Sequence, residues 1–209
     1  MSTPQPRWQR RKDARPSEIV EAGLAVFVEK GYAATRLDDV AKLAGVTKGT
    51  LYLYFESKEE LFKAVVRETL VPEIEMAETM ISDHAGNWTD FLRELVVRWA
   101  ERLAFGKSGG ILKLMIAEAA NFPELAEFYL NEVVVRSRRL FADVLERGIA
   151  AGEFRDTDIR MATKAITAPL LMVNIWGRSF QFCDPDHVTV TNFASYHFDM
   201  LMHGLKAKS

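Results

Sequence analysis

The stretch from Thr35 to Phe62, TRLDDVAKLAGVTKGTLYLYFESKEELF, constrains the fold of this chain more than any other part of it. It has the pattern of two short helices around a glycine turn, followed by the start of a third helix. Thr35 and Asp38 have the spacing of a helix N-cap and its N3 partner, and the apolar residues that follow recur with helical spacing. Gly45 supplies the left-handed conformation that commonly ends a helix. The pattern predicts a helix-turn-helix.

The second short helix is predicted to start after Thr47, its cap, and to expose a polar and basic face. Leu51 and Phe55 lie four residues apart and anchor one side, which leaves the other side to Lys48, Gly49, Thr50, Tyr52 and Tyr54. No acidic residue occurs from Val46 to Phe55. A recognition helix in the major groove presents its residues to base edges and phosphates, where carboxylates would be repelled. The face therefore points to double-stranded DNA as a partner.

The segments on both sides of this motif have matching patterns. Apolar residues repeat with helical spacing between Ile19 and Val28, after a cap at Ser17, and Gly31 closes that predicted helix. Residues 1–15 show no helical period and are strongly basic, so we expect a flexible basic arm. Ser57 and Glu60 form a second capping box, with Lys58 placed to bind a phosphate at the helix start.

The stretch AGVTKGTLYLYFESKEELF resembles the signature of the TetR family of bacterial transcriptional regulators, and the resemblance extends over about Ile19 to Phe62. It implies an all-α fold, with a three-helix DNA-binding domain at 16–58 and a helical ligand-binding and dimerisation domain at 59–209. Tyr54 departs from the family pattern, in which many members have histidine, but a tyrosine hydroxyl can also donate to a phosphate oxygen. The DNA-binding residues that we predict are Thr35, Arg36, Thr47, Lys48, Gly49, Thr50, Tyr52, Tyr54 and Lys58.

Charge and cysteine content fit this expectation. The net charge is −2, but residues 1–58 hold 10 Lys and Arg against 7 Asp and Glu, whereas residues 59–209 hold 17 against 22. Phosphate attraction depends on the local charge, which is positive where the motif lies. Cys183 is the only cysteine, so an intrachain disulfide is excluded and a cytoplasmic location is expected. No apolar run approaches the roughly 20 residues needed to span a bilayer.

The last two predicted helices, Ile159 to Trp176 and Val188 to Leu205, have apolar faces rich in small residues. A reader of DNA with one short recognition helix gains affinity and register from two-fold pairing on a palindromic operator. Together with the family resemblance, this favours a homodimer that pairs these two helices from each subunit. The predicted interface comprises Ala165, Ala168, Leu171, Met172, Phe193, Met200, Leu201 and Gly204.

The middle of the chain carries many large apolar side chains, and ligand pockets commonly lie between the helices of a bundle. For any single residue, ordinary core packing is the simpler interpretation. As a group they favour a small apolar or aromatic effector, with a few polar residues to orient it. The predicted ligand-binding residues are Met80, Trp88, Phe91, Trp99, Met115, Glu118, Phe122, Phe128, Met172 and Asn174.

Two other classes of function were weighed. A hydrolase would have to use Cys183 with Asp184 and His187, but nothing marks an oxyanion site or a positioned base. A helical protein-interaction module would keep the bundle without the exposed basic face. We expect no catalytic residue, no cofactor and no metal site, since neither HExxH nor CxxC spacing occurs. The predicted function is a ligand-responsive regulator, and the family resemblance implies a repressor that is released by its effector.

Overall fold

The computed structural model is all-helical, and it describes residues 7–186 and 188–206. Residues 1–6 of the predicted arm and His187 lie outside the described residues. The backbone forms two compact units. Residues up to Thr69, together with Leu114–Tyr129, make up unit 1, and Leu70–Lys113 with the residues from Leu130 onward make up unit 2.

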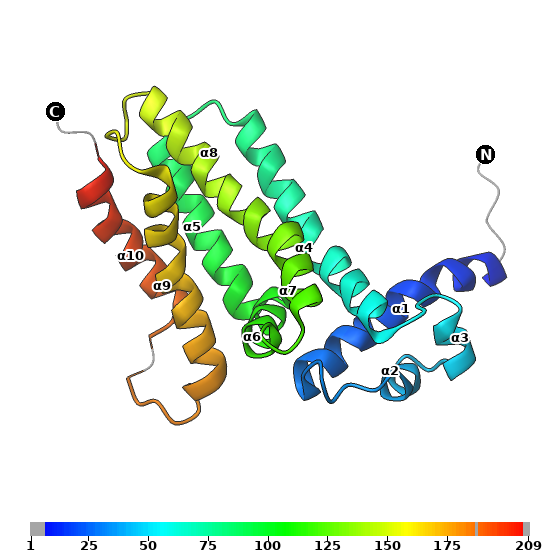
Figure 1. The fold of residues 1–209 in the computed structure, drawn as a ribbon. Coiled ribbons are helices and arrows are strands. Elements are labelled where there is room, and N and C mark those ends of the chain that lie inside the picture. Colours follow the sequence, from blue (N-terminus) through cyan, green and yellow to red (C-terminus); the bar gives the residue numbers. More distant parts are fainter. Residues whose placement is uncertain (1–6, 187, 207–209) are drawn as a thin grey trace, which may run out of the picture. The chain divides into compact units, whose positions relative to one another are not determined.

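Unit 1 contains α1 (Arg7–Lys30), α2 (Leu37–Leu43), α3 (Lys48–Tyr52), the first part of α4 (Lys58–Asp83), the end of α6 (Ser108–Glu118) and α7 (Pro123–Tyr129) (Figure 1). Its core is built on aromatic contacts. The Phe27 ring packs edge-on against Phe62, with ring centroids 5.2 Å apart, and Tyr32 lies 5.5 Å from Phe62 and 4.7 Å from Phe122. Leu51 is fully buried and secures α3 to this core, as its spacing predicted.

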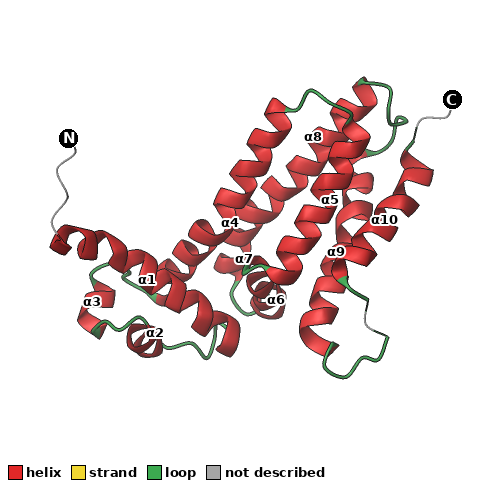
Figure 2. Cartoon of the chain, turned by 180° about the vertical axis from the view of Figure 1, so that it is seen from behind, coloured by secondary structure: helices red, strands yellow, loops and turns green. Residues whose placement is uncertain are grey.

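Unit 2 contains the rest of α4, α5 (Trp88–Phe105), the start of α6, the π-helical turn η1 (Leu130–Val135), α8 (Arg136–Ala150), α9 (Ile159–Phe180) and α10 (Val190–Leu205). Helix α5 packs against α8, α9 and α10 (Figure 2). Its buried residues recur with helical spacing, so one continuous face is covered by neighbouring helices; they are Phe91, Leu92, Val96, Ala100 and Leu103.

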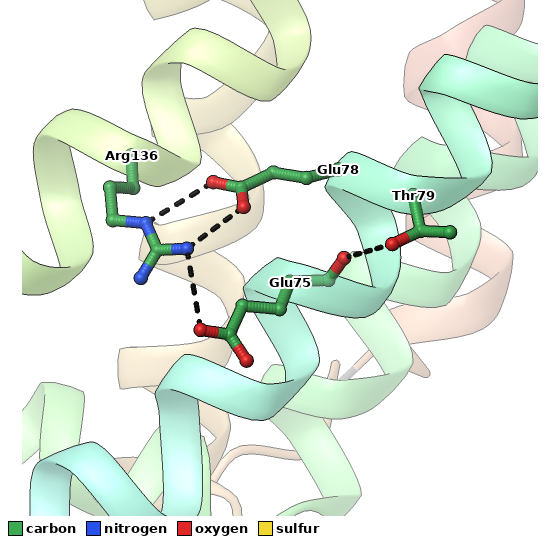
Figure 3. Close-up of polar contacts among 4 residues, drawn as sticks. All are labelled: Glu75, Glu78, Thr79 and Arg136. Atoms are coloured by element: carbon green, nitrogen blue, oxygen red, sulfur yellow. Dashed lines mark hydrogen bonds and ion pairs between the residues drawn. The ribbon is translucent and has the colours of Figure 1, made fainter.

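Two polar contacts tie the elements of unit 2 together. The Arg136 guanidinium donates two hydrogen bonds to the Glu78 carboxylate, at 3.1 and 2.8 Å, and lies 4.0 Å from Glu75 (Figure 3). This bidentate contact links the start of α8 to α4. The Glu153 carboxylate accepts hydrogen bonds from the backbone N–H groups of Trp88 and Thr89, at 2.9 and 2.8 Å. It thereby satisfies donors that the first turn of α5 leaves without intrahelical partners.

Three helices contain a proline in their interior. Helix α1 was predicted to begin at Ser17, but it begins at Arg7 and contains Pro16. Helix α4 contains Pro72 and runs on to Asp83, and α9 contains Pro169. A proline removes one backbone hydrogen bond, and the remaining bonds and the packing of each helix outweigh that loss.

Candidate nucleic-acid interface

The turn between α2 and α3 has the predicted geometry. Gly45 adopts φ +66°, a left-handed conformation that disfavours side chains, and the N–H of Val46 returns to the carbonyl of Ala41 at 3.0 Å. Thr47 then caps α3, because its hydroxyl accepts the N–H of Thr50 at 3.1 Å. Local hydrogen bonds thus fix both the end of α2 and the start of α3.

The outer face of α3 is open along its length. Lys48 and Gly49 are exposed, Tyr52 is 44% exposed, and Thr50 and Tyr54 are half-buried. Gly49 has an ordinary helical φ, and a Cβ built on it would meet only the Thr47 hydroxyl, at 3.9 Å. Glycine is unfavourable inside a helix, so the folded protein gains nothing from it there. A close approach of the helix backbone to a ligand would explain its use.

The cation of this face is held by a neighbouring carboxylate. The Lys48 ammonium lies 2.8 Å from Asp38 on α2, and both side chains are exposed. The hydrogen bond to Asp38 raises the pKa of Lys48 above its usual range. Exposed pairs of this kind contribute little to stability. Asp38 therefore orients the Lys48 ammonium, but the ion pair adds little to stability. A phosphate can replace Asp38 as the partner of Lys48.

Thr35 does not have the predicted role. It is 3% exposed, and its hydroxyl donates to the carbonyl of Gly31 at 2.7 Å. The N-cap of α2 is Arg36, whose side chain makes no capping hydrogen bond. The capping box predicted from Thr35 and Asp38 is wrong, because a carbonyl near the end of α1 takes up the Thr35 hydroxyl. Arg36 itself is exposed, as a DNA contact requires.

Lys58 has intramolecular partners in unit 1. Its ammonium donates to the carbonyls of Tyr32 and Ala33, at 2.8 and 3.1 Å, and lies 4.5 Å from the centre of the Tyr32 ring. Burial lowers the pKa of Lys58, and Glu118 acts in the opposite direction. The ammonium that was predicted to bind a phosphate thus has intramolecular partners in the link between α1 and α2, and its contact with DNA stays a prediction. The neighbouring cap was predicted correctly, since Ser57 Oγ accepts the N–H of Glu60 at 3.1 Å.

Leu53 is the residue at this face that the sequence pattern did not single out. It is 82% exposed and lies directly after α3, with helical backbone angles. Periodicity assigned Leu51 and Phe55 to the core and gave no reason to examine the apolar residue between them. The spacing itself, two residues from a buried leucine on a helix, could have indicated an outward position.

The comparisons with known proteins agree with this geometry. The family model "Bacterial regulatory proteins, tetR family" matches residues 19–65, and "Tetracyclin repressor-like, C-terminal domain" matches residues 83–180. The HTH-type transcriptional regulator YfiR of Bacillus subtilis is 33% identical over 153 residues, covering 69% of this chain and 70% of YfiR. The chain belongs to the tetR family of bacterial regulatory proteins. It is a ligand-responsive transcriptional regulator with a helix-turn-helix.

Two further relatives match nearly the whole regulator. The HTH-type transcriptional repressor KstR2 of Rhodococcus jostii is 26% identical over 196 residues, covering 93% of this chain and 92% of KstR2. The solved structure of the fatty acid degradation regulator FadR from Bacillus halodurans has a TM-score of 0.77 and 26% identity, covering 93% of this chain and 97% of that one. The all-α fold predicted from the sequence is confirmed.

The predicted ligand-binding residues of the regulator are distributed over both units. Four of them belong to unit 1, namely Met115, Glu118, Phe122 and Phe128. Glu118 Oε1 accepts the N–H of Ala33 at 3.2 Å, and Phe122 packs on Tyr32. Phe128 lies under the Arg67 guanidinium, 5.0 Å from it. These side chains therefore build the core and the turn of unit 1.

The remaining predicted ligand residues of the regulator lie in unit 2, in separate places. Trp88 and Phe91 form an aromatic cluster with His84, with ring centroids 4.4 to 5.9 Å apart. Trp99 packs edge-on against Phe141 at 5.5 Å, and Met80 is half-buried. Asn174 is buried and donates to the carbonyl of Leu103, near the end of α5.

Arg178, which no sequence motif marks, completes that end of α5. It donates to the carbonyls of Leu103, Ala104 and Gly106, at 2.9 to 3.0 Å. A cation near unpaired helix carbonyls is favourable, although burial lowers the pKa of this arginine.

A cavity of about 370 Å³ lies beside these two residues in the regulator. Its walls come from the end of α5, from α9 and from the start of α10, and among the predicted ligand residues they include Met172 and Asn174. The large apolar side chains of the wall are Phe105, Met172, Trp176 and Phe193, and carboxylates come from Asp184 and Asp186. Asp184 is already engaged by the Trp176 indole N–H, at 2.5 Å.

The faces of α9 and α10 that were predicted to pair are open within this protomer. Ala165, Ala168 and Gly204 are exposed, and Met172 and Met200 are 59% and 57% exposed. Leu171, Phe193 and Leu201 are half-buried. Met161, Trp176 and Tyr196 extend the same apolar surface at helical spacing.

Cys183, metal-binding side chains and membrane-spanning helices bear on other classes of function. Cys183 is exposed, and its thiol donates to the carbonyl of Phe180. Among the described residues, no group of three or more His, Cys, Asp or Glu side chains is placed to hold a metal ion. No helix in residues 7–186 and 188–206 is long and apolar enough to cross a membrane.

Proposed function

We propose that this protein is a cytoplasmic repressor that binds a palindromic operator as a homodimer and is released by a small apolar or aromatic effector. The observation that carries the proposal is the outer face of α3. It offers an ammonium, two hydroxyl-bearing side chains and a glycine that the fold does not need, in Lys48, Thr50, Tyr52 and Gly49. Cations and hydroxyls bind phosphates, and an open helix backbone can approach base edges closely.

The proposed interface of the dimer consists of the exposed apolar faces of α9 and α10. An uncovered stripe of methionine, tryptophan and tyrosine side chains, next to the small residues Ala165, Ala168 and Gly204, is the kind of surface that a second subunit covers. Two copies would hold their α3 helices about one DNA turn apart, roughly 34–36 Å, as adjacent major grooves require.

The apolar wall of the cavity in unit 2 supports an effector of low polarity. The relative FadR is a fatty acid degradation regulator, so a long-chain fatty acid such as palmitate is a suitable first probe. An effector that prefers a subunit arrangement with another spacing of the α3 helices weakens DNA binding, by typically about 1–3 kcal/mol of coupling.

The first test is fluorescence anisotropy with the DNA upstream of the protein's own gene, against unrelated DNA and across a salt series. We expect tight, selective binding to a duplex in that DNA, lost on Lys48→Ala or Tyr52→Ala. Arg138→Ala, which removes an exposed cation from unit 2, is the matched control and should leave binding unchanged. Equal, weak and steeply salt-dependent binding to both DNAs would indicate charge attraction alone. No binding even at low salt would favour the protein-interaction module.

The dimer is tested separately by size-exclusion chromatography with light scattering. Ala168→Arg places a charge on the proposed interface without filling space in the protomer core, because Ala168 is exposed. We expect the variant to have half the wild-type mass and to bind its operator far more weakly. A wild-type protein that is monomeric both free and on DNA would contradict the proposed assembly.

A further inference from the structure

Leu53 is an exposed apolar residue at the end of α3. Its backbone N–H bonds to the carbonyls of Gly49 and Thr50, so the residue is held in the last turn of the helix. The fully buried Leu51 lies two residues earlier, on the opposite side. Leu53 therefore points away from the core of unit 1, and 82% of its surface is accessible.

Leu53 and Gly49 share one face of α3, because they are four residues apart. A Cβ placed on Gly49 would meet nothing nearer than the Thr47 hydroxyl, at 3.9 Å. The surface above Gly49 is thus open, and Leu53 forms its apolar edge one turn further on. Side chains on helices lean toward the amino end, which turns the Leu53 isobutyl group toward this open space.

Leucine has neither a donor nor an acceptor, so it cannot read the hydrogen-bonding pattern of a base pair. In the major groove the apolar group that distinguishes one standard base from the others is the C5 methyl of thymine. We propose that Leu53, at the edge of the open space above Gly49, selects a thymine in each half-site by contact with this methyl group. The inference rests on the proposed function, in which α3 enters the major groove.

The test uses an operator obtained by selecting duplexes from a random pool with the wild-type protein. Each thymine is then replaced in turn by 2′-deoxyuridine, which removes only the methyl group. At one position per half-site we expect the replacement to weaken wild-type binding about 3- to 10-fold, the effect of losing one buried methyl contact. Leu53→Ala should bind the thymine operator more weakly by a similar factor and should not distinguish thymine from deoxyuridine at that position.

Two further variants serve as controls for the thymine preference. Leu53→Met keeps an apolar side chain and should retain the thymine preference. Leu43→Ala removes another exposed leucine, 58% accessible and on α2, and should retain it as well. Positions at which deoxyuridine weakens the wild type and Leu53→Ala equally, or the absence of any sensitive position, would overturn the inference while leaving the proposed function intact. A wild-type protein that selects no DNA would overturn both.

Discussion

Gly49→Ala should change folding stability and DNA binding in opposite directions. The substitution adds one methyl group in open space, 3.9 Å from the Thr47 hydroxyl, which is the nearest side chain of a residue not adjacent in sequence, at a residue whose φ is not positive. Replacing a helical glycine by alanine reduces the entropy of the unfolded chain, so we expect a gain of about 0.5–1 kcal/mol in the free energy of unfolding. The same methyl group lies on the face that we propose approaches the bases.

The loss in DNA affinity follows from the contacts that the methyl group would disturb. Holding α3 away from the base edges removes contacts worth about 1–3 kcal/mol each, which corresponds to about 5- to 150-fold in the dissociation constant. Urea unfolding followed by circular dichroism measures the first effect, and fluorescence anisotropy on the operator measures the second. A variant with unchanged operator affinity would refute the proposed approach of α3 to the bases.

Gly45→Ala is the contrasting control in the same unit. A Cβ at Gly45 also meets nothing within 4 Å, but here φ is +66°. The left-handed conformation costs an alanine about 1–2 kcal/mol, so this variant should lose stability. If both variants lost stability, the premise that the fold does not need a glycine at position 49 would be wrong.

Three further predictions concern contacts in the two units. Glu153→Gln should lower stability at neutral pH, because burial would raise the pKa of this carboxyl but its hydrogen bonds to Trp88 and Thr89 outweigh that effect and lower it. Because the pKa of Glu153 is lower in the folded protein, the ionised carboxylate stabilises the fold at pH values above the unfolded-state pKa of 4.5, and this contribution is lost as the pH falls through the lower folded-state pKa. Urea unfolding across this pH range should therefore show that the free energy of unfolding of the variant falls less with acid than that of the wild type. Gly148→Ala places a Cβ 2.2 Å from the Phe154 ring, so the free energy of unfolding should fall by about 1–3 kcal/mol; Gly177→Ala, which meets nothing nearer than 4.0 Å, should not lower it, and equal effects would contradict the overlap. Lys58→Gln should lower the melting temperature and leave the salt dependence of operator binding unchanged, because its ammonium bonds inside unit 1; a salt slope reduced by about 1 without loss of stability would instead support the predicted phosphate contact.

The parts of the fold that the sequence predicted correctly depend on neighbours along the chain. Gly31 and Gly45 end their helices with positive φ, and Thr47 and Ser57 cap theirs through N–H groups three residues ahead. These devices act within one turn of a helix, so their spacing is visible in the sequence. The helix-turn-helix could therefore be located before any tertiary contact was known.

Two of the predicted site residues bind partners that are distant in the sequence. Lys58 binds carbonyls 25 and 26 residues away, and Glu118 binds an N–H 85 residues away. No periodicity in a helix reveals such a partner. The predicted ligand residues are distributed over both units, since composition identifies large apolar side chains but not which core they join.

The structure of the helix-turn-helix separates residues with an intramolecular role from residues without one. The Thr35 hydroxyl and the Lys58 ammonium have hydrogen-bond partners within the protein, and Leu51 is buried in the core, so each of these side chains has a role in the fold. Gly49 and Leu53 have no such explanation, because the first would be replaced by alanine without a clash and the second is exposed. A residue that lowers or does not serve stability is retained where an external contact requires it. These two positions on α3, rather than the most basic ones, are therefore the most informative places to test how the regulator reads DNA.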